Sequence, residues 1–215
     1  MAMAAADELR RRILDGEFAA GFQLRQDALA KLLHISRIPV REALMELEGE
    51  GLVRILPHRG AIVSEVSAAD IDDLFGLRAL LEPRLLRRSA PRLTAGDFAA
   101  MERLLAEYSS AMRTGNPRRW GELNTAFHTL LYSRAGQPRS EAIVATLLQS
   151  ADRYTRMQLR FTDGRRRAER EHAELLALCR RGEVREAVTL LTRHIRNVGT
   201  VLAAFLRTHK PNVRA

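Results

Sequence analysis

Apolar residues recur at the spacing of helices through most of this chain, and alternate at the spacing of strands over one short stretch. Three short amphipathic helices are predicted near the N-terminus, over residues 4–15, 26–33 and 37–50. Two strands joined by a tight turn follow them, over 52–56 and 61–65. In the third helix Val40, Leu44 and Leu47 form the apolar stripe, which leaves Arg37 and Arg41 on the outer face. This order of elements predicts a winged helix-turn-helix, a fold that binds duplex DNA.

From Ser67 onward the pattern is that of helices alone. Six of them are predicted, over residues 67–89, 94–114, 117–135, 139–161, 165–181 and 183–208. Thr94 and Asp97 resemble the capping box that starts such a helix. We therefore expect a mainly α protein that consists of a winged helix-turn-helix over 1–65, an all-α six-helix bundle over 66–210 and a tail over 211–215.

Two arginines on the third predicted helix indicate a nucleic-acid contact. Arg37 and Arg41 stand four residues apart, so both guanidinium groups share one face, where they can pair with guanine edges or neutralise phosphates. The turn after the first strand adds a basic wing tip, with the sequence PHRG at 57–60. The alternative is that the arginines only solvate the helix and pair with Glu42 or Glu46. The joint pattern of turn, helix and basic wing favours DNA binding.

Charge and composition agree with a polyanionic partner. The chain has 35 Lys and Arg against 26 Asp and Glu, a net charge of +9. Its single cysteine, Cys179, excludes an intramolecular disulfide and fits a reducing cytoplasm. Because leucines surround Cys179, a buried thiol is favoured over a nucleophile. No apolar run approaches the ~20 residues that span a bilayer. We expect a soluble, cytoplasmic protein without a membrane partner.

Three histidines occupy apolar faces of three predicted bundle helices. His172 and His194 lie inside apolar stripes, and His128 lies beside one, four residues after Asn124. A single histidine on such a face is more often a satisfied core residue than a ligand. Three buried imidazoles are costly unless each finds a partner, and one divalent metal would satisfy all of them. The pattern alone leaves both interpretations open.

Arg78 is a second polar residue within an apolar face. It falls among the apolar positions of the first bundle helix, Ile71, Leu74, Phe75, Leu81 and Leu85. A guanidinium group in such a stripe needs an anion. The anion is either the carboxylate of Glu82, one helical turn away, or the carboxylate of a bound ligand.

The N-terminal motif resembles the DNA-binding domain of the GntR family of bacterial transcription regulators. The resemblance rests on SRIPVREALMELEGEGLV at 36–53 and RGAIV at 59–63, and it covers nearly all of 10–65. It implies a homodimer that reads a short inverted repeat in an operator. Ala20 and Ile38 depart from the family, which usually has proline and threonine at these positions. The residues expected to face DNA are Arg25, Ser36, Arg37, Ile38, Pro39, Arg41, His58, Arg59 and Gly60.

The bundle resembles the six-helix ligand-binding (FCD) domain of the FadR subgroup of that family. Many such domains bind a metal through an Asp-x3-His pair and a histidine on each of the last two helices. The resemblance assigns His128, His172 and His194 as metal ligands, with Asn124 at the aspartate position. An amide is a weaker ligand than a carboxylate. Zinc or nickel is expected ahead of manganese, with binding that weakens below about pH 6 as the histidines protonate.

The resemblance also places Arg78 in the effector cavity beside the metal. Three imidazoles and an amide are neutral, so they leave the two positive charges of the metal uncompensated. Arg78 adds a third positive charge, and Glu82 cancels at most one. The expected effector is therefore an anion, a small carboxylic acid. We therefore predict a ligand-responsive transcription regulator, a repressor, and no enzyme. The alternatives are an architectural DNA-binding protein without an effector and a metal-dependent hydrolase, although no carboxylate is placed as a general base.

Overall fold

The computed structural model describes residues 1–14, 17–57, 59–64, 67–115, 117–161 and 164–208. Within this part the chain divides into two compact units, one of residues 1–68 together with 204–208, and one of residues 69–203. The predicted boundary between residues 65 and 66 falls outside the described residues.

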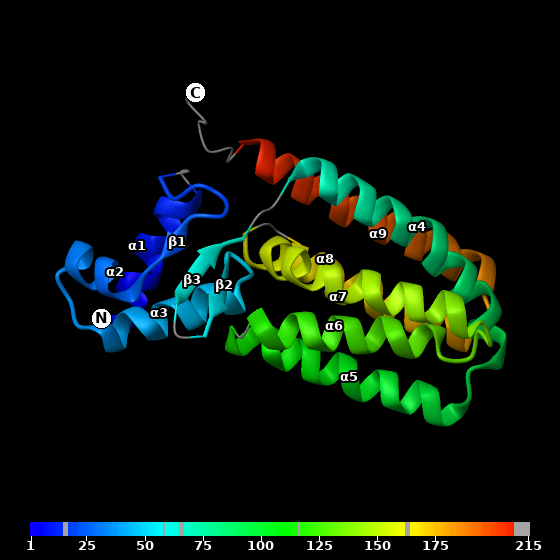
Figure 1. The fold of residues 1–215 in the computed structure, drawn as a ribbon. Coiled ribbons are helices and arrows are strands. Elements are labelled where there is room, and N and C mark those ends of the chain that lie inside the picture. The colour runs from blue at the N-terminus through cyan, green and yellow to red at the C-terminus, as the bar shows by residue number, and fades with distance from the viewer. Residues whose placement is uncertain (15–16, 58, 65–66, 116, 162–163, 209–215) are drawn as a thin grey trace. The chain divides into compact units, whose positions relative to one another are not determined.

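The N-terminal unit contains helices and one small antiparallel sheet (Figure 1). Its elements are α1 (Ala2–Leu14), β1 (Gln23–Leu24), α2 (Gln26–Leu33), α3 (Arg37–Gly49), β2 (Val53–Leu56) and β3 (Gly60–Val63). The strand order is β1-β3-β2, and Leu56 lies opposite Gly60 at the hairpin end. The winged helix-turn-helix is confirmed. Strand β1 was not predicted, because two residues are too few for an alternating pattern to be seen.

Gly60 is required by the packing of the sheet. Its φ is 87°, in the left-handed region. A Cβ atom at this position would lie 2.3 Å from the carbonyl oxygen of Leu24 on β1. Any larger residue would therefore push β1 away from β3, so this glycine has a structural role besides any contact with DNA.

A buried ion pair joins α1 to the end of α3. Arg10 is 8% exposed and Glu50 is 1% exposed. Nε and Nη2 of Arg10 donate to the two carboxylate oxygens of Glu50, each at 2.7 Å. Two parallel charge-assisted hydrogen bonds of this kind fix both the position and the angle of the Arg10 guanidinium group relative to the Glu50 carboxylate.

We expect Glu50→Ala to lower the stability of this unit by about 3 kcal/mol, the lower end of the ~3–5 kcal/mol typical of a broken buried pair. The lower end applies because Asp7 and Glu46 remain within reach of Arg10. Hydrogen exchange of the α1 and α3 amides measures the loss. Glu42→Ala, at an exposed position of α3, is the control and should change little. Equal protection in both variants would contradict a stabilising role for the pair.

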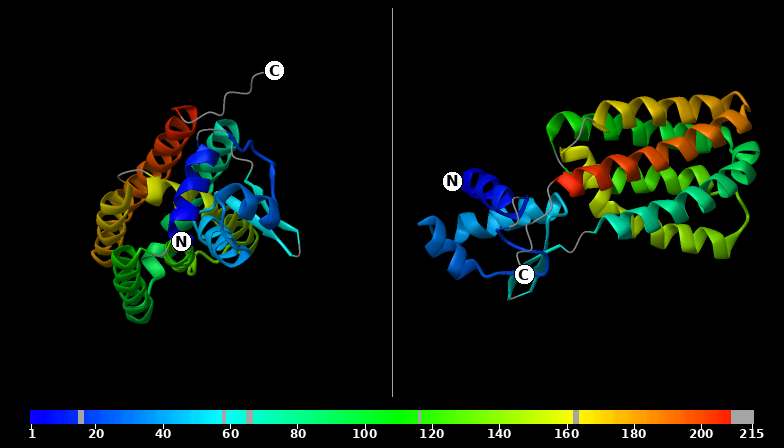
Figure 2. Two further views of the ribbon diagram at one scale, coloured as in Figure 1. Left: turned by 90° about the vertical axis from the view of Figure 1, so that its left-hand side faces the viewer. Right: turned by 90° about the horizontal axis from the view of Figure 1, so that it is seen from above.

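The second unit is a bundle of helices that run alongside one another (Figure 2). Its elements are α4 (Ala68–Ser89), the 3-10 turn η1 (Ala90–Arg92), α5 (Ala95–Thr114), α6 (Pro117–Tyr132), α7 (Pro138–Phe161), α8 (Gly164–Arg180) and α9 (Val184–Thr208). The all-helical prediction is confirmed, as is the capping box of Thr94 and Asp97. Helix α6 ends at Tyr132 and not at the predicted residue 135. None of the described helices is long and apolar enough to cross a bilayer.

Helices α4 and α9 lie side by side in the bundle (Figures 1 and 2). A Cβ atom built on Gly199 of α9 would lie 2.9 Å from the Cβ of Phe75 on α4. The glycine thus allows a close approach of the two helices. Arg78 and Glu82, which follow Phe75 by about one and two turns of α4, are buried as well.

Candidate functional site

Helix α3 presents most of its predicted DNA-contacting side chains on one open face. Arg37 and Arg41 are exposed, and Ile38 is 71% exposed although it is apolar. Ser36 has the extended backbone of an N-cap, with φ −74° and ψ 168°, but its side chain makes no capping hydrogen bond. Pro39 is buried, so it shapes the first turn instead of presenting a surface to DNA.

The two arginines of α3 differ in their surroundings. Nε of Arg37 lies 2.5 Å from Oδ1 of Asp27 on α2. This pairing differs from the alternative considered for the sequence, in which Glu42 or Glu46 would be the partner. Both Arg37 and Asp27 are well exposed, so the pair stabilises the fold little and is open to exchange for a phosphate.

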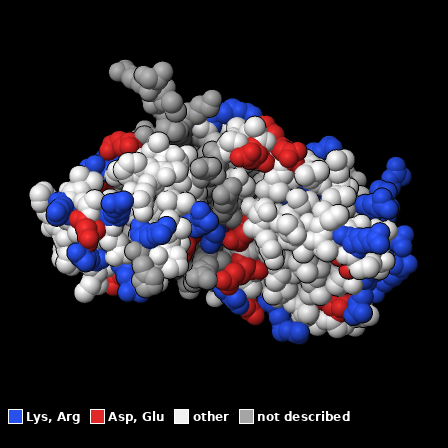
Figure 3. Space-filling model, viewed as in Figure 1, with Lys and Arg blue, Asp and Glu red and all other residues white. Residues whose placement is uncertain are grey.

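Arg25 and Arg59 extend the basic surface beyond α3. Arg25 directly precedes α2, and the backbone oxygen of Arg59 accepts a hydrogen bond from Nε2 of Gln23 at 3.1 Å. His58 lies outside the described residues. A concave surface encloses a volume of about 1240 Å³. Five basic side chains line it, those of Arg25, Lys31, Arg37, Arg41 and Arg59. Lys and Arg side chains are spread over this unit in Figure 3, as expected of a surface that meets phosphates.

Three bundle helices bring their histidines together at one point. His128 of α6, His172 of α8 and His194 of α9 each offer a ring nitrogen, and the three atoms lie within 4.8 Å of one another. The side chains are 0%, 0% and 5% exposed. Tetrahedral nitrogen ligands of zinc stand roughly 3.4 Å apart. Small side-chain rotations would therefore bring all three onto one ion.

Three ring nitrogens of this cluster lack a hydrogen-bond partner among the described residues. Among the described side chains, Nε2 of His128 and both ring nitrogens of His172 are buried without a hydrogen bond. Leaving a buried polar atom unsatisfied costs about 1–3 kcal/mol. A divalent transition metal would remove this cost for Nε2 of His128 and for one nitrogen of His172, because each imidazole would then coordinate through its lone pair. The donor set and its unpaired atoms therefore fit such a metal.

The other nitrogen of His128 faces a buried hydrogen-bonded network. The Tyr132 hydroxyl lies 3.0 Å from Nδ1 of His128 and donates to Oε2 of Glu82 at 2.5 Å. Oε1 of Glu82 accepts from Nε of Arg78 at 2.6 Å, which is the intrahelical pairing considered from the sequence. Burial acts to raise the pKa of the Glu82 carboxyl, but Arg78 and His128 outweigh it and hold that pKa below its ordinary value. Glu82 is thus a buried carboxylate.

His194 has a carboxylate partner of its own. Its Nδ1 lies 2.6 Å from Oε2 of Glu171 on α8. Burial acts to raise the pKa of Glu171, but the hydrogen bond to His194 and the charges of Arg167 and Arg193 lower it. The site therefore holds two carboxylates. Glu171 thus adds a second negative charge to that of Glu82, which was the one carboxylate considered from the sequence.

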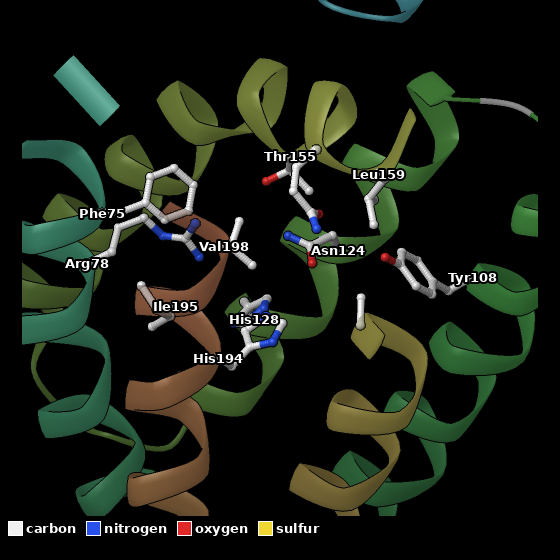
Figure 4. A pocket seen from close by; sticks show the side chains of 12 residues that line it. Phe75, Arg78, Tyr108, Asn124, His128, Thr155, Leu159, His194, Ile195 and Val198 are labelled. Atoms are coloured by element: carbon white, nitrogen blue, oxygen red, sulfur yellow. The ribbon is translucent and has the colours of Figure 1, made fainter. Parts of the chain in front are cut away.

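A small cavity lies beside the histidines (Figure 4). Its lining residues are Phe75, Arg78, Tyr108, Asn124, His128, Thr155, Gln158, Leu159, Ala168, His194, Ile195 and Val198. The side chains of Arg78 and Asn124 both point into it. Only about 10 Å³ is open to the centre of a water molecule, which is room for roughly one water or one ion.

Burial also sets the protonation of His128 and His172. It lowers the pKa of His128 to about 4 and that of His172 well below its ordinary value of 6.5. Both rings are therefore neutral at pH 7, which is the form that binds a metal.

We expect the metal-free protein to lose stability as the pH falls from 7 to 5. Unfolded histidines take up protons below their ordinary pKa of 6.5, whereas folded His128 resists protonation down to about 4. Linkage gives a loss of about 2 kcal/mol over this interval for His128, and the lowered pKa of His172 adds to the loss in the same direction. The lowered pKa of Glu82 affects stability only below about pH 4.5, the ordinary pKa of a glutamate, and so does not contribute between pH 7 and pH 5. Denaturation of chelator-treated protein at several pH values measures the slope of the free energy of unfolding against pH.

The control is a comparison of two histidine variants. His172→Leu should remove about half of the slope, and His34→Asn, at an exposed position, should leave it unchanged. A stability that is flat between pH 7 and pH 5 would contradict the assignment of neutral buried rings.

Three residues of this site were not singled out from the sequence. Tyr132 follows His128 by four residues, so helical spacing could have identified it. Tyr108 lines the cavity with a buried hydroxyl that bonds to nothing among the described residues. The contact of Glu171 with His194 joins two helices, and no local spacing signals it.

Comparison with known proteins bears on both units. Residues 2–63 match the family model described as bacterial regulatory proteins, gntR family, and residues 73–197 match the FCD domain. An HTH-type transcriptional regulator from the TAR-I ttuE-ttuC' intergenic region of Agrobacterium vitis is 33% identical over 138 residues, which cover 62% of this chain and 80% of that protein.

Two further proteins match over a longer stretch. The HTH-type transcriptional repressor RspR of Escherichia coli is 25% identical over 190 residues, which cover 88% of this chain and 83% of RspR. The crystal structure of a GntR-family transcriptional regulator from Pseudomonas syringae is similar with a TM-score of 0.56 and 32% identity. That similarity covers 97% of this chain and 87% of the other.

Proposed function

This chain belongs to the GntR family of bacterial DNA-binding transcription regulators and carries an FCD domain, and we propose that it is a repressor controlled by a divalent metal and a small organic acid bound in its bundle. Its relatives are transcription regulators and not enzymes, so the hydrolase alternative is rejected. The observation that carries the proposal is the buried cluster of three histidines beside Arg78, in which Nε2 of His128 and both ring nitrogens of His172 have no hydrogen bond to the described residues.

The donor set supports a transition metal. Imidazole nitrogens suit zinc and nickel, whereas manganese prefers carboxylate and water oxygens. His128, His172 and His194 would hold the ion, with the amide oxygen of Asn124 as a weaker fourth ligand. When bound, the metal would supply positive charge and open coordination positions in the cavity.

The charges around the cavity support an anionic effector. A divalent ion and Arg78 contribute about +3, and Glu82 and Glu171 contribute −2, which leaves about +1 in a low-dielectric interior. Arg78 uses Nε for Glu82, so its terminal nitrogens are the groups that could meet a carboxylate. The cavity has room for roughly one water or one ion, so any acid requires the walls to part, and a compact acid requires the smallest opening.

The DNA-facing part of the proposal rests on the basic surface of the N-terminal unit. We infer a homodimer in the cytoplasm whose two recognition helices read a short inverted repeat, with Arg59 and Gly60 of the wing at the minor groove. An architectural DNA-binding protein with a purely structural bundle is the remaining alternative. Operator affinity that ignores both metal and carboxylic acids would favour that alternative.

We expect Arg78→Lys to lower the affinity for the effector carboxylate by about 10-fold or more. Lysine keeps the charge that Glu82 needs, but its single nitrogen cannot serve Glu82 and a ligand with the geometry of a guanidinium group. Calorimetric titration with mono-, di- and tricarboxylates compares the variant with the wild type. Arg84→Lys, at an exposed position of α4, is the matched control. Equal binding of the acid by wild type and Arg78→Lys would remove Arg78 from the effector site.

A further inference from the structure

We propose that Glu171 is the positioning residue of His194, and that Glu82 acts with Tyr132 in the same way on His128. In each case a hydrogen bond at Nδ1 fixes the tautomer and turns Nε2 toward the centre of the cluster. The inference rests on the proposed metal site, but it concerns groups outside the coordination sphere. Residues of this kind fix ligand orientation and raise ligand basicity.

The contact at His194 determines which nitrogen carries the proton. A carboxylate only accepts hydrogen bonds, so Nδ1 of His194, 2.6 Å from Oε2 of Glu171, must be the donor. In the neutral ring the lone pair is then on Nε2. The side chain of Glu171 is only 14% exposed, so water competes little for this bond.

The network at His128 leads to the same tautomer by a different route. The Tyr132 hydroxyl gives its single proton to Glu82, so its oxygen can only accept from Nδ1 of His128. Nε2 of His128 is left buried without a hydrogen bond. Two histidines on different helices thus present the same nitrogen, each through its own carboxylate.

His172 differs from the other two histidines. Neither of its ring nitrogens makes a hydrogen bond to the described residues, and its ring packs 4.8 Å from Phe127 and 5.5 Å from Tyr108, between centroids. Packing alone holds it. Orientation of the cluster by hydrogen bonds therefore depends on Glu82 and Glu171.

The two carboxylates also supply charge that the proposed ligands lack. Three imidazoles and the amide of Asn124 are all neutral, and among the described residues Glu82 and Glu171 place negative charge directly behind His128 and His194. An imidazole that donates to a carboxylate is a stronger base and a better ligand. Glu82 also neutralises Arg78, whereas Glu171 has no such second role in the cavity. Glu171 is therefore the residue that tests the inference most cleanly.

The experiment compares Glu171→Ala, Glu171→Gln and the control Glu174→Gln. Glu174 lies on the same helix in an exposed ion pair with Arg181. Nitrogen-15 NMR of the metal-free protein reports the tautomer of His194, and zinc titration against a competing chelator reports affinity. We expect an Nδ1–H ring in the wild type and a zinc affinity about 10–100-fold lower in Glu171→Ala. Glu171→Gln keeps an acceptor oxygen and should restore part of this loss, and Glu174→Gln should match the wild type.

Two results would overturn the inference: an Nε2–H ring in the wild type, or unchanged zinc affinity in Glu171→Ala. If Glu171→Ala does not fold, the wild-type tautomer and the affinity of Glu171→Gln decide the matter. A wild type that binds no zinc would count against the proposed metal site, while the tautomer in the metal-free protein would still support or reject the role of Glu171.

Discussion

Arg41→Ala is expected to abolish specific operator binding while the fold remains intact. Arg41 is exposed and lines the basic concave surface, whereas its neighbour Arg37 is paired with Asp27. A lost bidentate contact to a base edge costs about 1–3 kcal/mol, and lost phosphate contacts add to this. In a symmetric dimer the loss occurs at both half-sites, so the effect on affinity is doubled in free energy.

Fluorescence anisotropy with operator DNA at ~150 mM salt measures this effect, because salt sets the phosphate contribution. Arg54→Ala is the matched control, since Arg54 is an exposed arginine of the same unit outside the lining of the concave surface. Binding of Arg41→Ala as tight as that of the control would show that α3 is not the recognition helix.

His172→Leu should change metal binding and stability in opposite directions. The wild type is expected to carry one equivalent of transition metal per chain, and the variant should bind it at least about 100-fold more weakly, since even partners behind the ligands contribute ~10–100-fold. The metal-free variant should be more stable by about 1–3 kcal/mol, because leucine has no buried nitrogen to satisfy. Weaker metal binding together with higher stability of the metal-free protein distinguishes a metal ligand from a residue that only packs in the core.

Elemental analysis of untagged protein and denaturation in the presence of a chelator provide the two measurements. His34→Asn serves as the control, because His34 is exposed with a φ of 53° that asparagine tolerates. Metal retained by His172→Leu, or a metal-free variant less stable than the wild type, would assign His172 to the core alone.

Helical spacing predicted the outward face of α3 and offered Glu82 as one of two possible partners of Arg78, although it was not used to identify Tyr132 beside His128. The outward face of α3 followed from the apolar stripe of Val40, Leu44 and Leu47, all of which are buried. The pairing of Arg78 with Glu82 follows from one turn of α4. In both cases the positions lie on one helix, so spacing alone decides which of them share a face.

Contacts between elements could not be predicted in this way. Glu171 stands next to His172 in the sequence but bonds to His194 on the following helix, and Arg10 meets a glutamate 40 residues away. Their pairing depends on how each helix is rotated about its axis, which local periodicity does not determine. The same limit applies to β1, which exists only because β3 pairs with it.

The tightness of the cavity has a consequence for the timing of regulation. Every lining residue except Val198 is buried, so a ligand larger than water enters only when the packed helices part. Its exchange rate is then set by the opening of the bundle, on a scale of about microseconds to seconds, and not by collision. If the proposed effector binds in this cavity, the response would follow the effector concentration averaged over the lifetime of the closed bundle, and not briefer changes.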